Sequence, residues 1–126
     1  MRRVLVTGGR RYHAQDLVDD ALEDELARSP TGMVLIHGGA AGADACAAAW
    51  ARGAKARGMR VDIECYSVST DDWRRHGKKA GPLRNARMVK FGHPDVCIAF
   101  PGGPGTADCA RRAKAAGVEI ILVLEN

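Results

Sequence analysis

Short apolar runs alternate along this chain with segments of helical periodicity, and this alternation restricts the possible folds more than any other feature. Residues 33–36 and 96–100 are wholly apolar, as in strands buried on both faces of a parallel sheet. Residues 61–66 include two acidic side chains, so we expect that strand at an edge. Residues 67–80 are polar and basic and are expected to form a loop with a short helical turn. The expected strands cover residues 4–6, 33–36, 61–66, 96–100 and 119–124, and the expected helices cover residues 14–28, 43–57, 81–91 and 106–116.

This alternation predicts an α/β fold, with a Rossmann-like, doubly wound parallel sheet of about five strands. The expected strand order is 3-2-1-4-5, with helices on both faces, and residues 1–126 suit a single nucleotide-binding domain. Ligands of such sheets bind at the carboxyl ends of the strands, near the point where the strand order reverses. We therefore expect the loops after the first, second and fourth strands to meet and form a site.

The loop after the fourth strand has the clearest ligand-binding pattern. Glycine lets the backbone approach a phosphate closely, and the free N–H groups and dipole of a helix start favour an anion. Thr106 is expected to cap the following helix. The alternative interpretation is a tight turn with a threonine cap and no ligand. The candidate ligand-binding residues in this loop are Pro101, Gly102, Gly103, Gly105 and Thr106.

The loop after the second strand repeats this arrangement and reads HGGAAGAD. Asp44 falls in the first turn of the next helix, where it either favours the helix dipole or binds a ribose hydroxyl. His37 follows the strand directly and is the histidine we expect to touch a ligand. The candidate ligand-binding residues here are His37, Gly38, Gly39, Gly42 and Asp44.

The loop after the first strand supplies Thr7, Gly8, Gly9 and Arg10 as further ligand-binding candidates. An arginine fork can bind a phosphate through two parallel hydrogen bonds. The chain lacks GxGxxG after its first strand and lacks the GxxxxGK[ST] pattern, which disfavours an ordinary NAD dehydrogenase or ATPase.

A local basic patch lies within residues 71–88. A cation early in a helix opposes the helix dipole, so Arg84, beside Asn85, indicates an anionic partner; the alternative is a solvated basic face. Trp73 either stacks on a base or covers the edge of its helix. The basic residues of the patch are Lys78, Lys79, Arg84 and Arg87.

Composition narrows the possible partners. The net charge of +4 suits an anionic ligand, but the basic residues are spread along the chain, so nucleic acid is not an expected partner. The four cysteines have no CxxC spacing and the four histidines no metal-ligand spacing, so we expect reduced core cysteines and no metal. No apolar run approaches the roughly 20 residues that span a bilayer. The start MRR leads straight into a strand, so we expect a cytoplasmic protein without a signal peptide or membrane partner.

Five segments spread in order over nearly the whole chain carry a resemblance to a known family: TGGRRY (7–12), HGGAAGAD (37–44), DDW (71–73), GKKAGPLRNARM (77–88) and AFPGGPGTADCARRAKAAG (99–117). With these segments the chain resembles the YspA/YpsA-related branch of the SLOG superfamily. This resemblance implies a Rossmann-like fold, a ligand related to nucleotides, NAD or ADP-ribose, a homo-oligomer, and occurrence in bacteriophages and actinobacteria. The superfamily also includes Lonely Guy phosphoribohydrolases and the DNA-processing protein DprA.

Lonely Guy enzymes carry the motifs PGGxGTxxE and RKxxM, and this chain matches them in part. Asn85 replaces the lysine and Cys109 replaces the glutamate, with Asp108 one residue earlier. The resemblance therefore implies phosphate binding, and it implies Arg84 and Asp108 as catalytic residues only if the protein is an enzyme. The matching positions are residues 101–106, Arg84 and Met88.

Three functions follow from these patterns. The first is binding of a nucleotide-derived ligand, as a sensor or sequestering protein in phage–host conflict. The second is N-glycosidic hydrolysis of a nucleoside 5′-monophosphate, with Asp108 replacing the missing glutamate. Single-stranded nucleic acid binding ranks last, because such sites combine a basic groove with stacking aromatics and aromatic residues make up only 5% of this chain.

Overall fold

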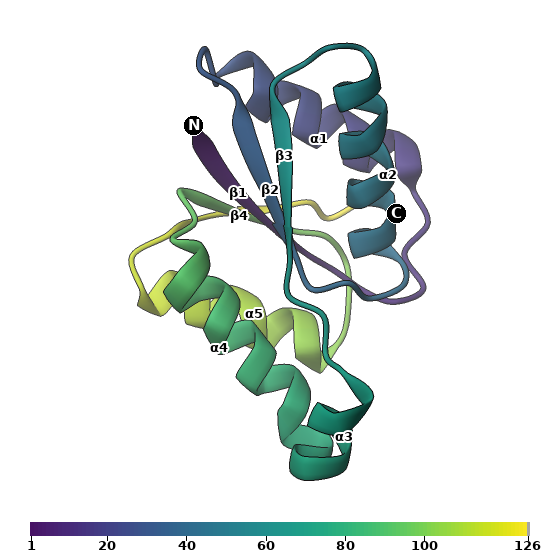
Figure 1. The fold of residues 1–126 in the computed structure, drawn as a ribbon, viewed down its shortest axis with the longest axis vertical. Helices are drawn as coiled ribbons and strands as arrows, with labels where there is room; N and C mark the ends of the chain where they lie inside the picture. The colour runs from purple at the N-terminus through teal and green to yellow at the C-terminus, as the bar shows by residue number, and fades with distance from the viewer. Residues whose placement is uncertain (126) are drawn as a thin grey trace.

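A computed structural model describes residues 1–125, in which five parallel strands form one sheet (Figure 1). The strand order is β3-β2-β1-β4-β5, as the sequence predicts. β3 lies at one edge, which confirms the expectation drawn from its acidic residues. The strands are β1 (Arg2–Thr7), β2 (Met33–His37), β3 (Val61–Cys65), β4 (Val96–Ala99) and β5 (Glu119–Leu122).

Helices cover both faces of the sheet, which confirms the doubly wound arrangement (Figure 1). One face packs against α1 (Gln15–Ala27) and α2 (Ala43–Ala56). The opposite face packs against α4 (Ala80–Gly92) and α5 (Pro104–Ala115). The strand order reverses at β1, so the loops after β1 and β4 flank the crevice where ligands of such sheets bind.

Alternating side chains of β1 divide the core between the two helical layers. Val4 and Val6 point into the cluster formed with α1 and α2, while Leu5 points into the cluster formed with α4 and α5. All three side chains are fully buried, and each such burial stabilises the fold by about 1.5–3 kcal/mol. The central strands therefore need apolar residues at every position, which explains their uninterrupted apolar runs.

The segment expected to be a loop with a short helical turn forms a helix of two turns. It contains α3 (Thr70–His76), followed by the 3₁₀ turn η1 (Gly77–Lys79). Ser69 caps α3: its hydroxyl accepts from the N–H of Asp72 at 3.0 Å, and the Asp72 carboxylate accepts from the N–H of Ser69 at 3.1 Å. This capping box stabilises a helix that projects away from the sheet beside the N-terminal end of α4 (Figure 1).

The start of α5 also differs from the prediction. The helix begins at Pro104, two residues before the expected start, and its N-cap is Gly103. The expectation that Thr106 caps the helix is therefore wrong, because Thr106 is the third residue of the first turn. Proline is suited to the first helical position, since its missing N–H would have no partner there and its φ is already helical.

All four cysteines are free thiols. Cys46, Cys97 and Cys109 are buried and pack in the core as expected, whereas Cys65 is exposed at the end of β3. Within residues 1–125, no helix has the length and apolar character needed to cross a membrane.

Candidate functional site

The loops after β1, β2 and β4 are joined by backbone hydrogen bonds. The N–H of Gly9 donates to the carbonyl of Pro101 at 2.9 Å, which connects the loops after β1 and β4. The N–H of Ala43 donates to the carbonyl of Gly9 at 3.1 Å, which connects the start of α2 to the loop after β1. The structure thus brings together the three loops that the sequence predicts to meet.

The glycines of these loops have two different roles. A Cβ on Gly42, which has a φ of +79°, would collide with the backbone of Gly9 and Arg10. A Cβ on Gly102 would collide with the backbone nitrogen of Gly9, in the loop after β1, and with the Thr106 hydroxyl. These two glycines therefore permit close packing between loops. Gly103 and Gly105 are different, because nothing lies within 4 Å of the position of their missing Cβ.

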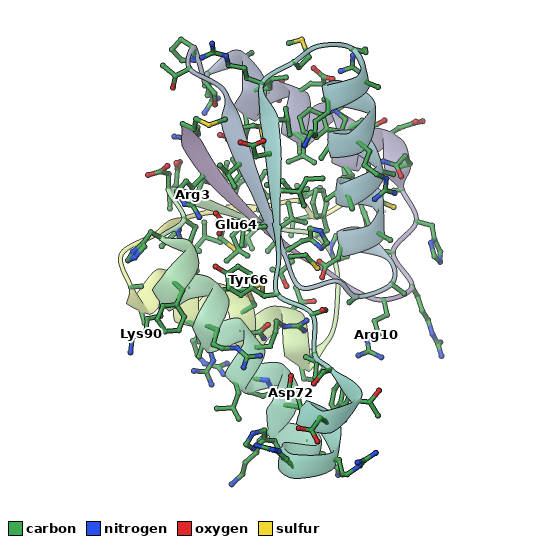
Figure 2. All side chains as sticks on the ribbon, in the orientation of Figure 1. Arg3, Arg10, Glu64, Tyr66, Asp72 and Lys90 are labelled. Atoms are coloured by element: carbon green, nitrogen blue, oxygen red, sulfur yellow. The ribbon has the colours of Figure 1, made fainter. Side chains whose placement is uncertain are left out.

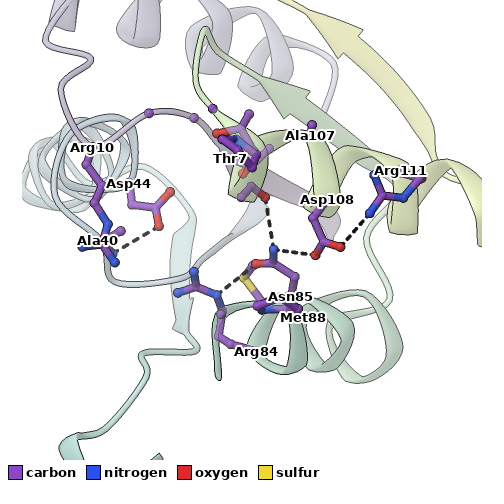
Figure 3. Close-up of a pocket in the computed structure, with 18 of the residues that line it drawn as sticks. Thr7, Arg10, Ala40, Asp44, Arg84, Asn85, Met88, Ala107, Asp108 and Arg111 are labelled. Atoms are coloured by element: carbon purple, nitrogen blue, oxygen red, sulfur yellow. Dashed lines mark hydrogen bonds and ion pairs between the residues drawn. The ribbon is translucent and has the colours of Figure 1, made fainter. Parts of the chain in front are cut away.

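A cavity of about 780 Å³ lies beside this loop junction, between β1, α4 and the first turns of α5 (Figure 3). Many of the predicted ligand-binding residues line it, together with Asp108, which is predicted as catalytic only if the protein is an enzyme. Those that do are Thr7, Gly8, Gly9, Arg10, Asp44, Arg84, Asn85, Gly103, Gly105, Thr106 and Asp108.

The other predicted residues lie outside the lining and support it. The His37 side chain is buried, and its Nδ1 accepts a hydrogen bond from the N–H of Gly39 at 3.0 Å. Burial lowers the pKa of His37, so its imidazole is held in the neutral form. This histidine orders the loop after β2 from outside the cavity lining. The predicted residues outside the lining are His37, Gly38, Gly39, Gly42, Pro101 and Gly102.

Arg84 reaches from α4 to the loop after β2. Its Nη1 donates to the carbonyl of Gly38 at 2.6 Å. Its Nε donates to Oδ1 of Asn85 at 3.0 Å, a contact that Figure 3 shows. The guanidinium lies directly over Gly38, where a Cβ would meet it. Gly38 therefore makes room for the arginine, and the arginine is held in place before any ligand binds.

Asn85 connects α4 to α5. Its amide is buried, and Nδ2 donates to Oδ2 of Asp108 at 3.0 Å and to the carbonyl of Gly105 at 3.2 Å. The Asp108 carboxylate also accepts from Arg111 and from Arg112, each at 2.9 Å. Partial burial raises the pKa of Asp108, but the hydrogen bonds from Asn85 and Arg112 and the two arginine charges outweigh it and hold that pKa below its usual value.

Asp44 is a second carboxylate of the cavity, and it is almost fully buried. One oxygen, Oδ2, accepts from the N–H groups of Gly38 at 3.0 Å and Ala40 at 3.2 Å. Burial raises the pKa of Asp44, although these two hydrogen bonds and the nearby His37 and Arg84 oppose the rise. Asp44 thus orders the loop after β2, and no side-chain hydrogen bond within residues 1–125 engages its other oxygen, Oδ1.

The first turn of α5 offers backbone donors to the cavity. The N–H groups of Gly105 and Thr106 precede the first intrahelical bond of this helix, which runs from Ala107 to the carbonyl of Gly103 at 3.1 Å. Such N–H groups have no partner within the helix and lie at the positive end of its dipole. Since no Cβ stands on Gly103 or Gly105, an anion can approach this turn closely.

Charge in the lining is mostly positive. Four cations, Arg10, Lys78, Arg84 and Arg111, face two carboxylates, Asp44 and Asp108. The Arg10 side chain extends outward from the loop after β1 (Figure 2). With the helix dipole of α5, this excess favours a negatively charged ligand.

Sequence reasoning missed several lining residues. Arg111 is the most important, and its position three residues after Asp108 on one helical face could have indicated it. Lys78 belongs to the predicted basic patch, and stacking on a base is one of the two roles expected for Trp73, but only the folded chain brings both residues to this cavity. The lining residues that sequence reasoning did not name as ligand-binding are Val6, Ala40, Trp73, Lys78, Gly81, Pro82, Met88, Pro104, Ala107 and Arg111.

Comparison with known proteins agrees with this architecture. Over 123 residues the chain is 51% identical to the Gene 61 protein of Mycobacterium phage D29, a match that covers 96% of this chain and 95% of that protein. The X-ray structure of TM1055 is similar in fold, with a TM-score of 0.63 at 19% identity, over 95% of this chain and 72% of that one. Residues 2–76 match the model of the YspA, cpYpsA-related SLOG family. The chain therefore belongs to the YspA, cpYpsA-related SLOG family.

Proposed function

We propose that residues 1–126 act as a single nucleotide-binding domain, which holds a nucleotide or a nucleotide-derived ligand of the NAD or ADP-ribose type. The observation that carries this proposal is the cavity at the junction of the three glycine-rich loops. There the open backbone of Gly103 and Gly105 adjoins a cationic lining. A phosphate on the first turn of α5 would receive backbone N–H groups and the helix dipole.

The size of the cavity supports a small-molecule ligand. Its volume of about 780 Å³ falls within the roughly 300–1,000 Å³ that is typical of such sites. Arg84 is already oriented by Gly38 and Asn85, so little ordering is needed when a phosphate binds. The unengaged Oδ1 of Asp44 is available to accept a hydrogen bond from a ribose hydroxyl.

Calorimetry with ADP-ribose, NAD and mononucleotides tests this proposal. We expect at least one of them to bind, and we expect Arg84→Ala to weaken its binding about 10-fold or more, since a hydrogen bond to a charged group is lost. Arg28→Ala is the matched control, because Arg28 is an exposed arginine outside the cavity lining. The absence of binding by every one of these ligands would contradict the proposal.

The biological role we propose is that of a sensor or sequestering protein in phage–host conflict. Support comes from the similarity to a mycobacteriophage protein. This role requires that the ligand be held in the cell, which mass spectrometry of protein purified from its host cytoplasm without removal of bound ligand tests. A co-purifying nucleotide derivative is the expected result. The homo-oligomer implied by the resemblance stays a prediction, which sedimentation would test.

A second candidate is hydrolysis of a nucleoside 5′-monophosphate to its free base and ribose 5-phosphate. The observation that favours it is Asp108, an ionised carboxylate in the same cavity as Arg84. Both Asp108 oxygens already accept hydrogen bonds, and Cys109, at the motif position of the glutamate, is fully buried. We therefore rank this function second. Chromatography of AMP after incubation tests it; if turnover occurs and Asp108→Asn leaves it intact, Asp108 is not the catalytic carboxylate.

A further inference from the structure

We propose that Trp73 is the stacking platform for the base of the bound nucleotide, so that the ligand must combine a planar aromatic ring with its phosphate. This inference rests on the proposed function and assigns the residue that recognises the base of the ligand. Base-bearing ligands are accepted, whereas simple sugar phosphates lack the group that Trp73 binds.

The exposure of Trp73 is the first observation. Its side chain lines the cavity yet is 42% exposed, in a chain with only two tryptophans. The other, Trp50, is 5% exposed, and its Nε1 donates to Glu23 at 2.9 Å. Trp50 is thus a core residue. Trp73 is not, because α3 contains no buried residue.

The surroundings of Trp73 leave its ring available. Within residues 1–125, the ring takes part in no aromatic pair and its Nε1 makes no hydrogen bond. Gly81 and Pro82 line the same part of the protein, and no atom lies within 4 Å of the position that a Gly81 Cβ would take. Because the Trp73 residue is 42% exposed and lines the cavity, its indole is available for a flat ring to stack on.

The backbone that carries Trp73 is held in place. Its N–H donates to the carbonyl of Ser69 at 3.1 Å, inside the capping box, and its carbonyl accepts from the N–H of Gly77, which ends α3. The neighbouring Asp72 also lies 4.0 Å from Arg87 on α4. These contacts order the backbone of α3 around Trp73 and leave the indole exposed, so the platform exists before a ligand binds.

Different residues of the cavity suit the phosphate and the base of a nucleotide. The turn at Gly103–Thr106 and the arginine of α4 suit a phosphate, and Trp73 comes from a different element and suits an aromatic base. Stacking on an aromatic side chain accepts any base because every base has a π-face. We therefore expect Trp73 to distinguish nucleotides from sugar phosphates and not to distinguish one base from another.

Calorimetry with matched ligands tests the inference. AMP and ADP-ribose carry the base, and ribose 5-phosphate lacks it. We expect Trp73→Ala to weaken the binding of the base-bearing ligands by about 5- to 100-fold and to leave ribose 5-phosphate unchanged. Trp73→Phe should retain much of the affinity, because phenylalanine keeps a stacking face. Phe91→Ala is the control, since Phe91 is an exposed aromatic outside the cavity lining.

Intrinsic fluorescence gives an independent measurement. Trp73→Phe leaves Trp50 as the one tryptophan of the chain, so the change in tryptophan emission on adding AMP should be present in the wild type and absent in this variant. Two results would overturn the inference and leave the proposed function intact. One is an equal loss of affinity for all three ligands in Trp73→Ala, and the other is full affinity of that variant for the base-bearing ligands. If the wild type binds none of them, and binds neither NAD nor any other mononucleotide, the proposed function and this inference fail together.

Discussion

The side-chain amide of Asn85 donates a hydrogen bond to the carboxylate of Asp108 at 3.0 Å, and this contact joins the two helices that flank the cavity. The same amide accepts from Nε of Arg84 at 3.0 Å. Arg84, Asn85 and Asp108 thus form a continuous chain from α4 to α5 (Figure 3). A lysine at position 85, as in the Lonely Guy motif, could donate to Asp108 but could not accept from Arg84.

Replacing Asn85 by alanine should destabilise the protein and loosen Arg84. The substitution removes a buried amide with three hydrogen bonds and leaves the Gly105 carbonyl without this donor, so we expect a loss of about 1–3 kcal/mol in the free energy of unfolding. Urea denaturation measures it. Leu83→Ala, an exposed position on the same helix, should change stability much less. A loss no larger than that of the control would mean that the amide chain contributes little.

Replacing Asp44 by asparagine should remove a pH dependence. Burial raises the pKa of this carboxyl in the folded state, so its contribution to stability is present at low pH and declines as pH rises through that raised pKa. The asparagine oxygen can still accept from Gly38 and Ala40. We expect the free energy of unfolding of the variant to rise relative to that of the wild type between about pH 4 and about pH 7, as measured by urea denaturation at a series of pH values. A constant difference across this range would contradict the argument.

Asp108→Asn should have the opposite pH behaviour. The pKa of Asp108 is lowered in the folded state, so its contribution to stability is present above its ordinary value and is lost as pH falls through the lowered one. We expect the variant to be less stable than the wild type at neutral pH, and the gap to close in acid. Thermal melts of both proteins in matched buffers check this, and a gap that widens in acid would disprove it.

Two glycine substitutions should separate packing from binding. Gly42→Ala places a Cβ against the backbone of Gly9 and Arg10 at a φ of +79°, so we expect a loss of about 1–3 kcal/mol in stability. Gly105→Ala meets no atom within 4 Å and lies in the first turn of α5, so it should keep full stability and weaken ligand binding. Melting temperature and calorimetry, measured for both variants, decide this. A stable Gly42→Ala protein would contradict the first expectation, and unchanged ligand binding in Gly105→Ala would contradict the second.

Local sequence patterns predicted most of the fold, but they did not predict the start of α5 or the full length of the helix before α4. Thr106 was expected to cap α5 because threonine is a good N-cap, yet Pro104 begins the helix earlier. The capping box of Ser69 and Asp72 is a local pattern that could have been recognised, and it makes α3 longer than the expected short turn.

The sequence predicts only part of the site, because only residues that follow strands can be placed from local patterns. Residues directly after strands could be expected at one edge of the sheet, so the glycine loops were found. Arg111 and Trp73 could not be assigned to the cavity, because they reach it only through the packing of α5 and α3. The opposite holds for His37 and Gly42, which lie in the predicted loops but support the lining from outside.

The sequence by itself determined the strand order and the meeting of three glycine-rich loops, because apolar periodicity and right-handed crossovers leave few topologies open. Only the tertiary structure decided which glycines pack against a neighbouring loop and which lie open, and which charged side chains share a cavity. Those outcomes depend on distances between atoms far apart in the chain. Gly42 and Gly103 are the same residue type in similar loops, and only the atoms packed around them make one a packing contact and the other a surface that a phosphate can approach.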